Sequence, residues 1–124
     1  VSARADEVMP NVSALIGGLV AARLLSRAGG LSALARMPGS TIQVLGSEQA
    51  LFSHLRGGTP PPKHGIIFQH RRVHNAPREV RGRVARVLSA KIAIAARLDY
   101  FRGVLAPEFI DDAQRRIDEA GMVA

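Results

Sequence analysis

The longest helical repeat in this chain coincides with all of its excess positive charge. Residues 71–102 contain nine basic and two acidic side chains, a surplus that equals the formal net charge of the whole chain, +7. Through the same stretch, apolar residues recur at the spacing of one helix face: Val80, Val84, Val87, Leu88, Ile92, Ala95 and Leu98. The pattern predicts a long helix over residues 77–102, with one side in a hydrophobic core and a basic surface beside it. Nucleic acid is the commonest partner for such a surface.

Arginines dominate that basic surface. Arg83, Arg86 and Arg97 fall within about 60° of one another on a helical wheel, and Arg78 and Arg81 cluster where the helix starts. No pattern of Glu four residues earlier offers them intrahelical partners, as would be expected on a merely solvated face. Because a planar guanidinium suits phosphate recognition, we expect these arginines to contact a nucleic-acid backbone.

Lys91 falls inside the apolar arc rather than beside it. Three arrangements are open for this residue. Its stem snorkels along apolar surface, its ammonium pairs with an acid such as Asp99 or one on another helix, or it lies at an edge of the protein.

Length and composition bound the class of protein. A chain of 124 residues fits one domain with a modest core, and 47% hydrophobic residues argue against disorder. The absence of cysteine excludes disulfides and thiolate metal sites. The longest apolar run, residues 12–25, is too short and too interrupted to cross a bilayer, and no signal peptide is evident. Because the chain begins at Val1 rather than Met, we expect a fragment of a longer protein.

The remaining segments favour an all-α fold. One amphipathic helical segment is expected from Pro10 to the glycine pair at 29–30, and shorter helices over 31–37 and over 47–56, where Ser47 is the N-cap. Residues 40–46 are expected to be extended or in a tight turn. Residues 57–62 are expected to form a loop, and the apolar run 65–68 could be one buried strand-like piece. A last helix is expected over residues 107–120, before Gly121.

No set of residues in the sequence points to catalysis. His64, His70 and His74 are a conceivable zinc set, but no cysteine supports them and few acids lie near them. The glycine pairs lack the Gly-Lys-Ser/Thr of a phosphate loop, and no serine elbow or close carboxylate pair is evident. We therefore expect no enzyme activity, no metal and no cofactor, and we expect the histidines to hydrogen-bond phosphate or stack on a base.

Three stretches resemble the signatures of the Nop domain family. They are PNVSALIGGLVAARLLSRAGGLSALARMPGSTIQVLGSEQALF at residues 10–52, PKHGIIFQH at 62–70 and RGRVARVLSAKIAIAARLDYF at 81–101. Together they cover nearly the whole chain in the order expected of the family. The direct run from PPPKHG to the basic helix is most similar to the archaeal scaffold protein of box C/D small RNPs, and a spliceosomal protein is related.

The resemblance implies an all-α domain over residues 1–124 that binds a composite surface. That surface is made by a kink-turn (box C/D) RNA together with a kink-turn-binding ribosomal-type protein. In the complete scaffold, an N-terminal domain recruits the methyltransferase fibrillarin and a coiled coil mediates self-association, and both lie outside residues 1–124. The implied role is to scaffold RNA-guided 2′-O-methylation of ribosomal RNA, in the cytoplasm of an archaeon or the nucleolus of a eukaryote.

The resemblance also indicates site residues. The family's Gly-Ala-Glu-Lys motif aligns with Gly46, Ser47, Glu48 and Gln49, so Gln49 offers a neutral hydrogen bond where the family has a basic residue. RNA contacts in the family match positions in the loop 63–64 and on the basic helix: Lys63, His64, Arg81, Arg83, Arg86 and Arg97. The loop 69–75 is expected near the RNA stem, which adds Gln69, and Arg78 completes the RNA-binding set.

Two other classes of function remain open from the residues alone. A helical DNA-binding domain would insert the long helix into a major groove and would prefer bare duplex DNA. A protein–protein adaptor would dock its basic helix on an acidic partner and would bind with RNA absent.

Overall fold

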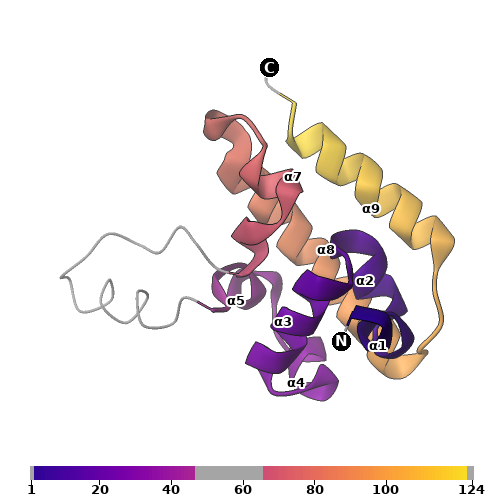
Figure 1. The fold of residues 1–124 in the computed structure, drawn as a ribbon. Coiled ribbons are helices and arrows are strands. Elements are labelled where there is room, and N and C mark those ends of the chain that lie inside the picture. The colour runs from indigo at the N-terminus through magenta and orange to yellow at the C-terminus, as the bar shows by residue number, and fades with distance from the viewer. Residues whose placement is uncertain (1, 47–65, 123–124) are drawn as a thin grey trace.

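The computed structural model describes residues 2–46 and 66–122, and their regular elements are helical (Figure 1). In chain order the elements are α1 Ser2–Val8, α2 Pro10–Ile16, α3 Gly18–Ala28, α4 Leu31–Ala35, α5 Gly39–Val44, η1 Ile66–Gln69, α7 Arg71–His74, η2 Arg78–Val80, α8 Arg81–Phe101 and α9 Pro107–Ala120. Neither described range contains a strand, and this confirms the predicted all-α class.

Helix α8 is the central element of the core. It packs against α2, α4, α5, α7 and α9, and Figure 1 shows α9 running alongside it while α1 to α4 gather near its C-terminal half. Its buried side chains are Val84, Ala85, Leu88, Ser89, Ile92, Ala93, Ala95, Ala96 and Asp99. The predicted core arc is therefore confirmed at its centre, but Val87 and Leu98 are only half-buried. The buried side contains more alanines than predicted, and their small side chains allow neighbouring helices to approach closely.

The predicted amphipathic helix after Pro10 is two helices instead of one. Gly17 has φ +82° between α2 and α3, a conformation that residues with a Cβ rarely adopt. Its N–H still donates to the Ser13 carbonyl at 2.7 Å, so the chain turns without losing that hydrogen bond. The predicted stop is confirmed, because Gly29 ends α3 in the left-handed conformation.

The prediction that residues 40–46 are extended or in a tight turn was wrong for residues 40–44, whereas residues 45–46 do form a turn. Residues 39–44 form α5, which packs against α8 and fully buries Ile42. A Cβ placed on Gly39 would lie 3.0 Å from the Ala90 Cα atom, so the glycine permits this close approach. Tertiary packing has overridden the local preference of the β-branched residues for an extended chain.

The apolar run at 65–68 is not a strand in the part that the structure describes. Residues 66–69 form the 3₁₀ turn η1, and Ile67 is fully buried. The Ile66 N–H donates to the Leu45 carbonyl at 2.8 Å, so the two described ranges meet at this point. A single turn buries the apolar side chain without requiring a partner strand.

The sequence did not predict the two short helices α1 and α7. It did predict α8 and α9, the two long helices at the end of the chain. The long basic helix begins with the 3₁₀ turn η2 and continues as α8, and α9 has the predicted bounds. No helix among the described residues has the length and apolar character needed to span a membrane.

Candidate nucleic-acid interface

Three arginines form an exposed stripe along α8. Arg83, Arg86 and Arg97 are all exposed, and they lie beside the buried side of the helix. We call these three residues the arginine stripe. With a rise of 1.5 Å per residue, the stripe is about 21 Å long. The structure therefore brings these three predicted site residues together.

Arg86 and Arg97 keep their charges available. Among the residues that the structure describes, neither guanidinium has a hydrogen-bond acceptor or an acid within bonding distance. Asp99 is the one acid in the α8 sequence, and it points into the core. The stripe thus presents cations whose counter-ions are not supplied by α8 itself.

Arg83 is shared between the stripe and the end of α9. Its Nε donates to the Ala120 carbonyl at 2.9 Å and its Nη2 to the Met122 carbonyl at 2.6 Å. These bonds satisfy carbonyls at a helix C-terminus, where a cation is also favoured by the helix dipole. Since a guanidinium has five N–H donors, three remain for another acceptor.

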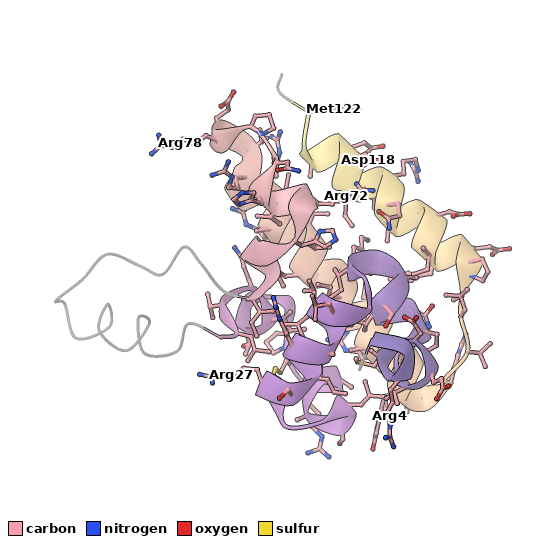
Figure 2. All side chains as sticks on the ribbon, viewed as in Figure 1. Arg4, Arg27, Arg72, Arg78, Asp118 and Met122 are labelled. Carbon is pink, nitrogen blue, oxygen red and sulfur yellow. The ribbon has the colours of Figure 1, made fainter. Side chains whose placement is uncertain are left out.

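The two arginines predicted to cluster at the start of the long helix are placed differently. Arg81 is half-buried, and its Nη2 donates to the carbonyls of His74 and Ala76 at 3.1 and 3.3 Å. Arg78 is exposed, and Figure 2 shows its side chain directed away from the molecule. Arg81 therefore has a structural role at the α7 turn, and Arg78 lies free at the end from which the stripe begins. An RNA contact from either residue stays a prediction.

Arg72 joins two helices and is not part of a free basic surface. Its guanidinium pairs with Asp118 of α9 and also donates to the Gln114 Oε1 atom at 2.6 Å. Figure 2 shows Arg72 and Asp118 on facing sides of α7 and α9. This pair spans 46 residues of sequence, so the charge count over 71–102 gave no signal of it.

The possible pairing of Lys91 with Asp99 was wrong. Asp99 is only 4% exposed, and its carboxylate accepts hydrogen bonds from the backbone N–H groups of Asn11 and Val12 at 2.9 and 3.0 Å. It therefore caps the N-terminus of α2, where the dipole favours a negative charge. Lys91 is half-buried at the edge of the protein, in an open groove of 570 Å³ between α8 and α9. The edge arrangement is thus the one observed.

Asn11 extends the Asp99 cap into the turn after α8. Its Nδ2 donates to the Asp99 carboxylate at 2.8 Å and to the Val104 carbonyl at 3.0 Å. Its Oδ1 accepts from the Ala106 N–H at 2.8 Å. This network fixes the C-terminal end of α8 against α2, and sequence reasoning missed it because its members lie about ninety residues apart.

Only part of the predicted motif at residues 46–49 can be placed. Gly46 has φ +97°, and a Cβ there would lie 2.6 Å from the Ile66 Cγ1 atom, so this position requires glycine. Ser47, Glu48, Gln49, Lys63 and His64 lie outside the described residues. Gln69 ends the η1 turn, and its backbone alone is described.

A family profile matches nearly the whole chain. Residues 1–119 match the Nop family, described as "snoRNA binding domain, fibrillarin". A solved structure of a fibrillarin/Nop5p complex contains a chain similar to this one, with a TM-score of 0.77 and 39% identity, over 96% of this chain and 44% of that chain.

Curated relatives come from archaea and eukaryotes. A NOP5 family protein of Methanocaldococcus jannaschii is 50% identical over 114 residues, which cover 92% of this chain and 28% of the relative. Nucleolar protein 58 of Candida albicans is 45% identical over 100 residues, 81% of this chain and 19% of that protein. Nucleolar protein 56 of Mus musculus is 40% identical over 114 residues, 92% of this chain and 20% of that protein.

The chain thus spans less than a third of the length of these curated relatives. The residues matched by the family profile, 1–119, include every described helix from α1 to α8 and all but the last residue of α9. The chain belongs to the Nop family of snoRNA-binding domains.

Proposed function

We propose that this chain binds a kink-turn RNA together with the RNA's ribosomal-type protein, and so scaffolds a box C/D complex for RNA-guided 2′-O-methylation. The observation that carries the proposal is the arginine stripe, with Arg86 and Arg97 exposed and unpaired within the described residues. In a chain of the Nop family, RNA phosphates are the anions that fit these cations best.

Recognition is mainly of shape and phosphate. The stripe is straight and rigid, because the buried side of α8 is packed against five helices. A-form RNA hides its major-groove base edges, so a straight row of guanidiniums meets the backbone rather than the bases. The same packing argues against a DNA-recognition helix, which must enter a major groove and therefore needs more of its surface free.

The proposal assigns no chemistry to this chain. Fibrillarin would be recruited by parts of the scaffold that lie beyond residues 1–124, and the Nop domain would hold the guide RNA in position relative to it. A nucleolar location in a eukaryote, or a cytoplasmic one in an archaeon, belongs to the same proposal.

A gel-shift series tests this function. The chain is titrated against kink-turn RNA, the ribosomal-type protein, their complex, and a duplex DNA of equal length. We expect binding to the RNA–protein complex that is much tighter than to the RNA or the protein alone. If about five phosphates are contacted, the slope of log affinity against log salt concentration should lie between about −3 and −5.

Three results would count against the proposal. Preference for the bare DNA duplex would favour a DNA-binding domain. Equal binding to the ribosomal-type protein with RNA absent, and resistance of the assembly to nuclease, would favour a protein adaptor. Losses on Arg86→Ala that vary strongly between guide sequences would contradict recognition of shape and phosphate.

A further inference from the structure

The C-terminal end of α8 exposes apolar side chains beside the arginine stripe. Phe101 is 78% exposed, Tyr100 46% and Val104 68%, and Leu105 is also exposed. We call these four residues the aromatic end of α8. Monomeric proteins rarely leave contiguous apolar side chains in water without a partner.

The aromatic end is held rigidly. The Tyr100 and Phe101 rings meet edge to face, with centroids 5.0 Å apart and planes at 71°. Behind them, the Arg102 N–H donates to the Leu98 carbonyl at 2.8 Å, and Gly103 turns the chain with φ +69°. Asn11 then holds the Val104 carbonyl. The exposed rings therefore belong to an ordered end of the helix, as a preformed binding surface requires.

Phe101 continues the arginine stripe. It lies four residues after Arg97, one helix turn away on the same side of α8. Its position is about 27 Å along the helix axis from Arg83. The exposed neighbours Arg97 and Arg102 have no acid or acceptor within bonding distance in the described part of the chain.

This combination suits an unpaired nucleotide. Single-stranded nucleic acid is bound by aromatic rings that stack on bases and by cations that hold the adjoining phosphates. A duplex stem laid along the arginine stripe hides its base faces, and a base is available for stacking only where pairing ends. A protein partner would also cover apolar groups, but two unpaired guanidiniums beside the ring favour an anionic one.

We propose that the aromatic end of α8 is a stacking subsite for an unpaired nucleotide of the bound RNA, with Phe101 stacking on the base and Arg97 and Arg102 contacting its flanking phosphates. The inference rests on the proposed function, since the stem must lie along the arginine stripe. It adds that the RNA ends its pairing near Phe101.

Paired RNA probes test the subsite. The probe is a kink-turn RNA bound by its ribosomal-type protein, either with blunt stems or with a four-uridine extension placed in turn at each strand end. Fluorescence anisotropy measures the dissociation constant of the 124-residue chain for each. We expect an extension at one strand end to tighten binding by about tenfold. A 2-aminopurine in that extension should lose fluorescence when it stacks.

Substitutions then assign the effect to the ring. Phe101→Leu keeps an apolar side chain but has no aromatic face, so it should abolish the gain from the extension, whereas Phe101→Trp should keep it. Leu19→Ala, at an apolar residue of α3 that is 53% exposed, is the matched control and should leave the gain intact. Circular dichroism checks that each variant is folded.

The outcomes separate the two proposals. If the blunt complex does not bind, the proposed function fails and the subsite fails with it. If the blunt complex binds and Arg86→Ala weakens it, but no extension tightens binding, the subsite alone is overturned. The subsite is also overturned if Phe101→Leu weakens blunt and extended probes equally, or weakens binding to the ribosomal-type protein with RNA absent, because either result assigns the aromatic end to protein packing.

Discussion

Helices α8 and α9 both expose arginines, but α9 also contains acids that neutralise its own arginines. On α9, Arg116 lies 3.0 Å from the Asp112 carboxylate, and Arg115 pairs with the same carboxylate and with Glu119 at 3.5 Å. On α8, Arg86 and Arg97 have no such partner among the described residues. The difference between the two helices is that α9 has acids three and four residues from its arginines, whereas α8 has none at those distances from Arg86 and Arg97.

The spacing of these acids determines which arginines are free to bind an anion. Either arginine of α9 must give up a carboxylate before it contacts phosphate, whereas Arg86 or Arg97 gives up only water. Asp112 shows the strength of the local pairing, because hydrogen bonds first from Arg116 and then from Arg115 hold the pKa of its carboxyl below the ordinary value of 3.8. RNA should therefore select α8 and leave α9 nearly untouched.

The largest expected effect comes from removing the two free arginines. Arg86→Ala with Arg97→Ala should weaken binding to the RNA–protein complex by about 100-fold, at about tenfold for each charge-assisted contact. The salt slope should become shallower by about two. Affinities measured by anisotropy at several salt concentrations give both quantities.

The matched control is the double variant Arg115→Ala with Arg116→Ala, which removes the same charge from α9. It should weaken binding by less than about threefold, because exposed ion pairs contribute little and neither arginine is available to the RNA. Equal losses in the two double variants would mean that net charge, rather than the pairing pattern, determines binding.

A second prediction concerns the one acid of α8, which is turned inward instead of toward the stripe. Asp99→Asn replaces an acceptor of three N–H bonds with an amide that accepts fewer, and should lower the free energy of unfolding by about 2 kcal/mol. Urea denaturation measures the change. Asp111→Asn, at an exposed acid of α9, should change it by less than about 0.5 kcal/mol. A small effect at Asp99 would contradict its role as the cap of α2.

Sequence reasoning found the features that depend on neighbours along one helix. The bounds of α9, the stop at Gly29 and the common side of Arg83, Arg86 and Arg97 follow from helical spacing and glycine conformation, and the structure agrees with them. These properties are local, so a single sequence contains the information for them.

Features that depend on distant contacts were missed. The Asp99 carboxylate caps two backbone N–H groups that are 88 and 87 positions away from it in the sequence. The Arg72–Asp118 pair joins two residues that are 46 positions apart. The helical state of α5 follows from its packing on α8 at Gly39, against the preference of its β-branched residues. In each case the deciding partner is brought near only by the folded chain.

The resemblance added what neither spacing nor composition contained. It named the RNA and protein partners, and the family assignment is shown by the profile match. Of the site residues it indicated, Arg83, Arg86 and Arg97 lie together on one surface, whereas Arg81 turns inward. Fold class and stripe were thus predictable, while the division between free and engaged arginines required the structure.

A smaller effect is expected from placing an acid on α8 four residues before an arginine, as Asp112 lies before Arg116 on α9. Gly82 is exposed on α8 four residues before Arg86, and a Cβ there would meet no atom within 4 Å. Gly82→Glu should stabilise the fold by about 0.5 to 1 kcal/mol through helix propensity, and should weaken RNA binding by about threefold because the new carboxylate pairs with Arg86. Thermal unfolding and anisotropy measure the two effects.

Gly82→Gln separates charge from propensity in this test. It should give a similar stabilisation, because Gln is also a good helix former, but should leave RNA affinity within about twofold of the original. If Gln weakens RNA binding as much as Glu does, then Gly82 itself lies against the RNA, and the loss is steric rather than electrostatic.

The smallest expected effect is that of removing the acid that neutralises α9. Because the pKa of Asp112 is lowered in the folded chain, its carboxylate stabilises the fold above the ordinary value of 3.8, and this contribution is lost as the pH falls below that value toward the lowered pKa. Asp112→Asn should therefore lower the melting temperature slightly at pH 7, but not at a pH below the lowered pKa of Asp112. Added salt should reduce the difference in melting temperature at pH 7. The same substitution frees Arg116 and leaves Arg115 with Glu119 as its acid, so the salt slope for RNA binding shows whether α9 is excluded only by its own acids. A slope that becomes steeper would mean that the RNA can reach α9 and that pairing alone keeps its arginines from binding. An unchanged slope would mean that the RNA lies along α8 alone, as the geometry of the arginine stripe and Phe101 requires.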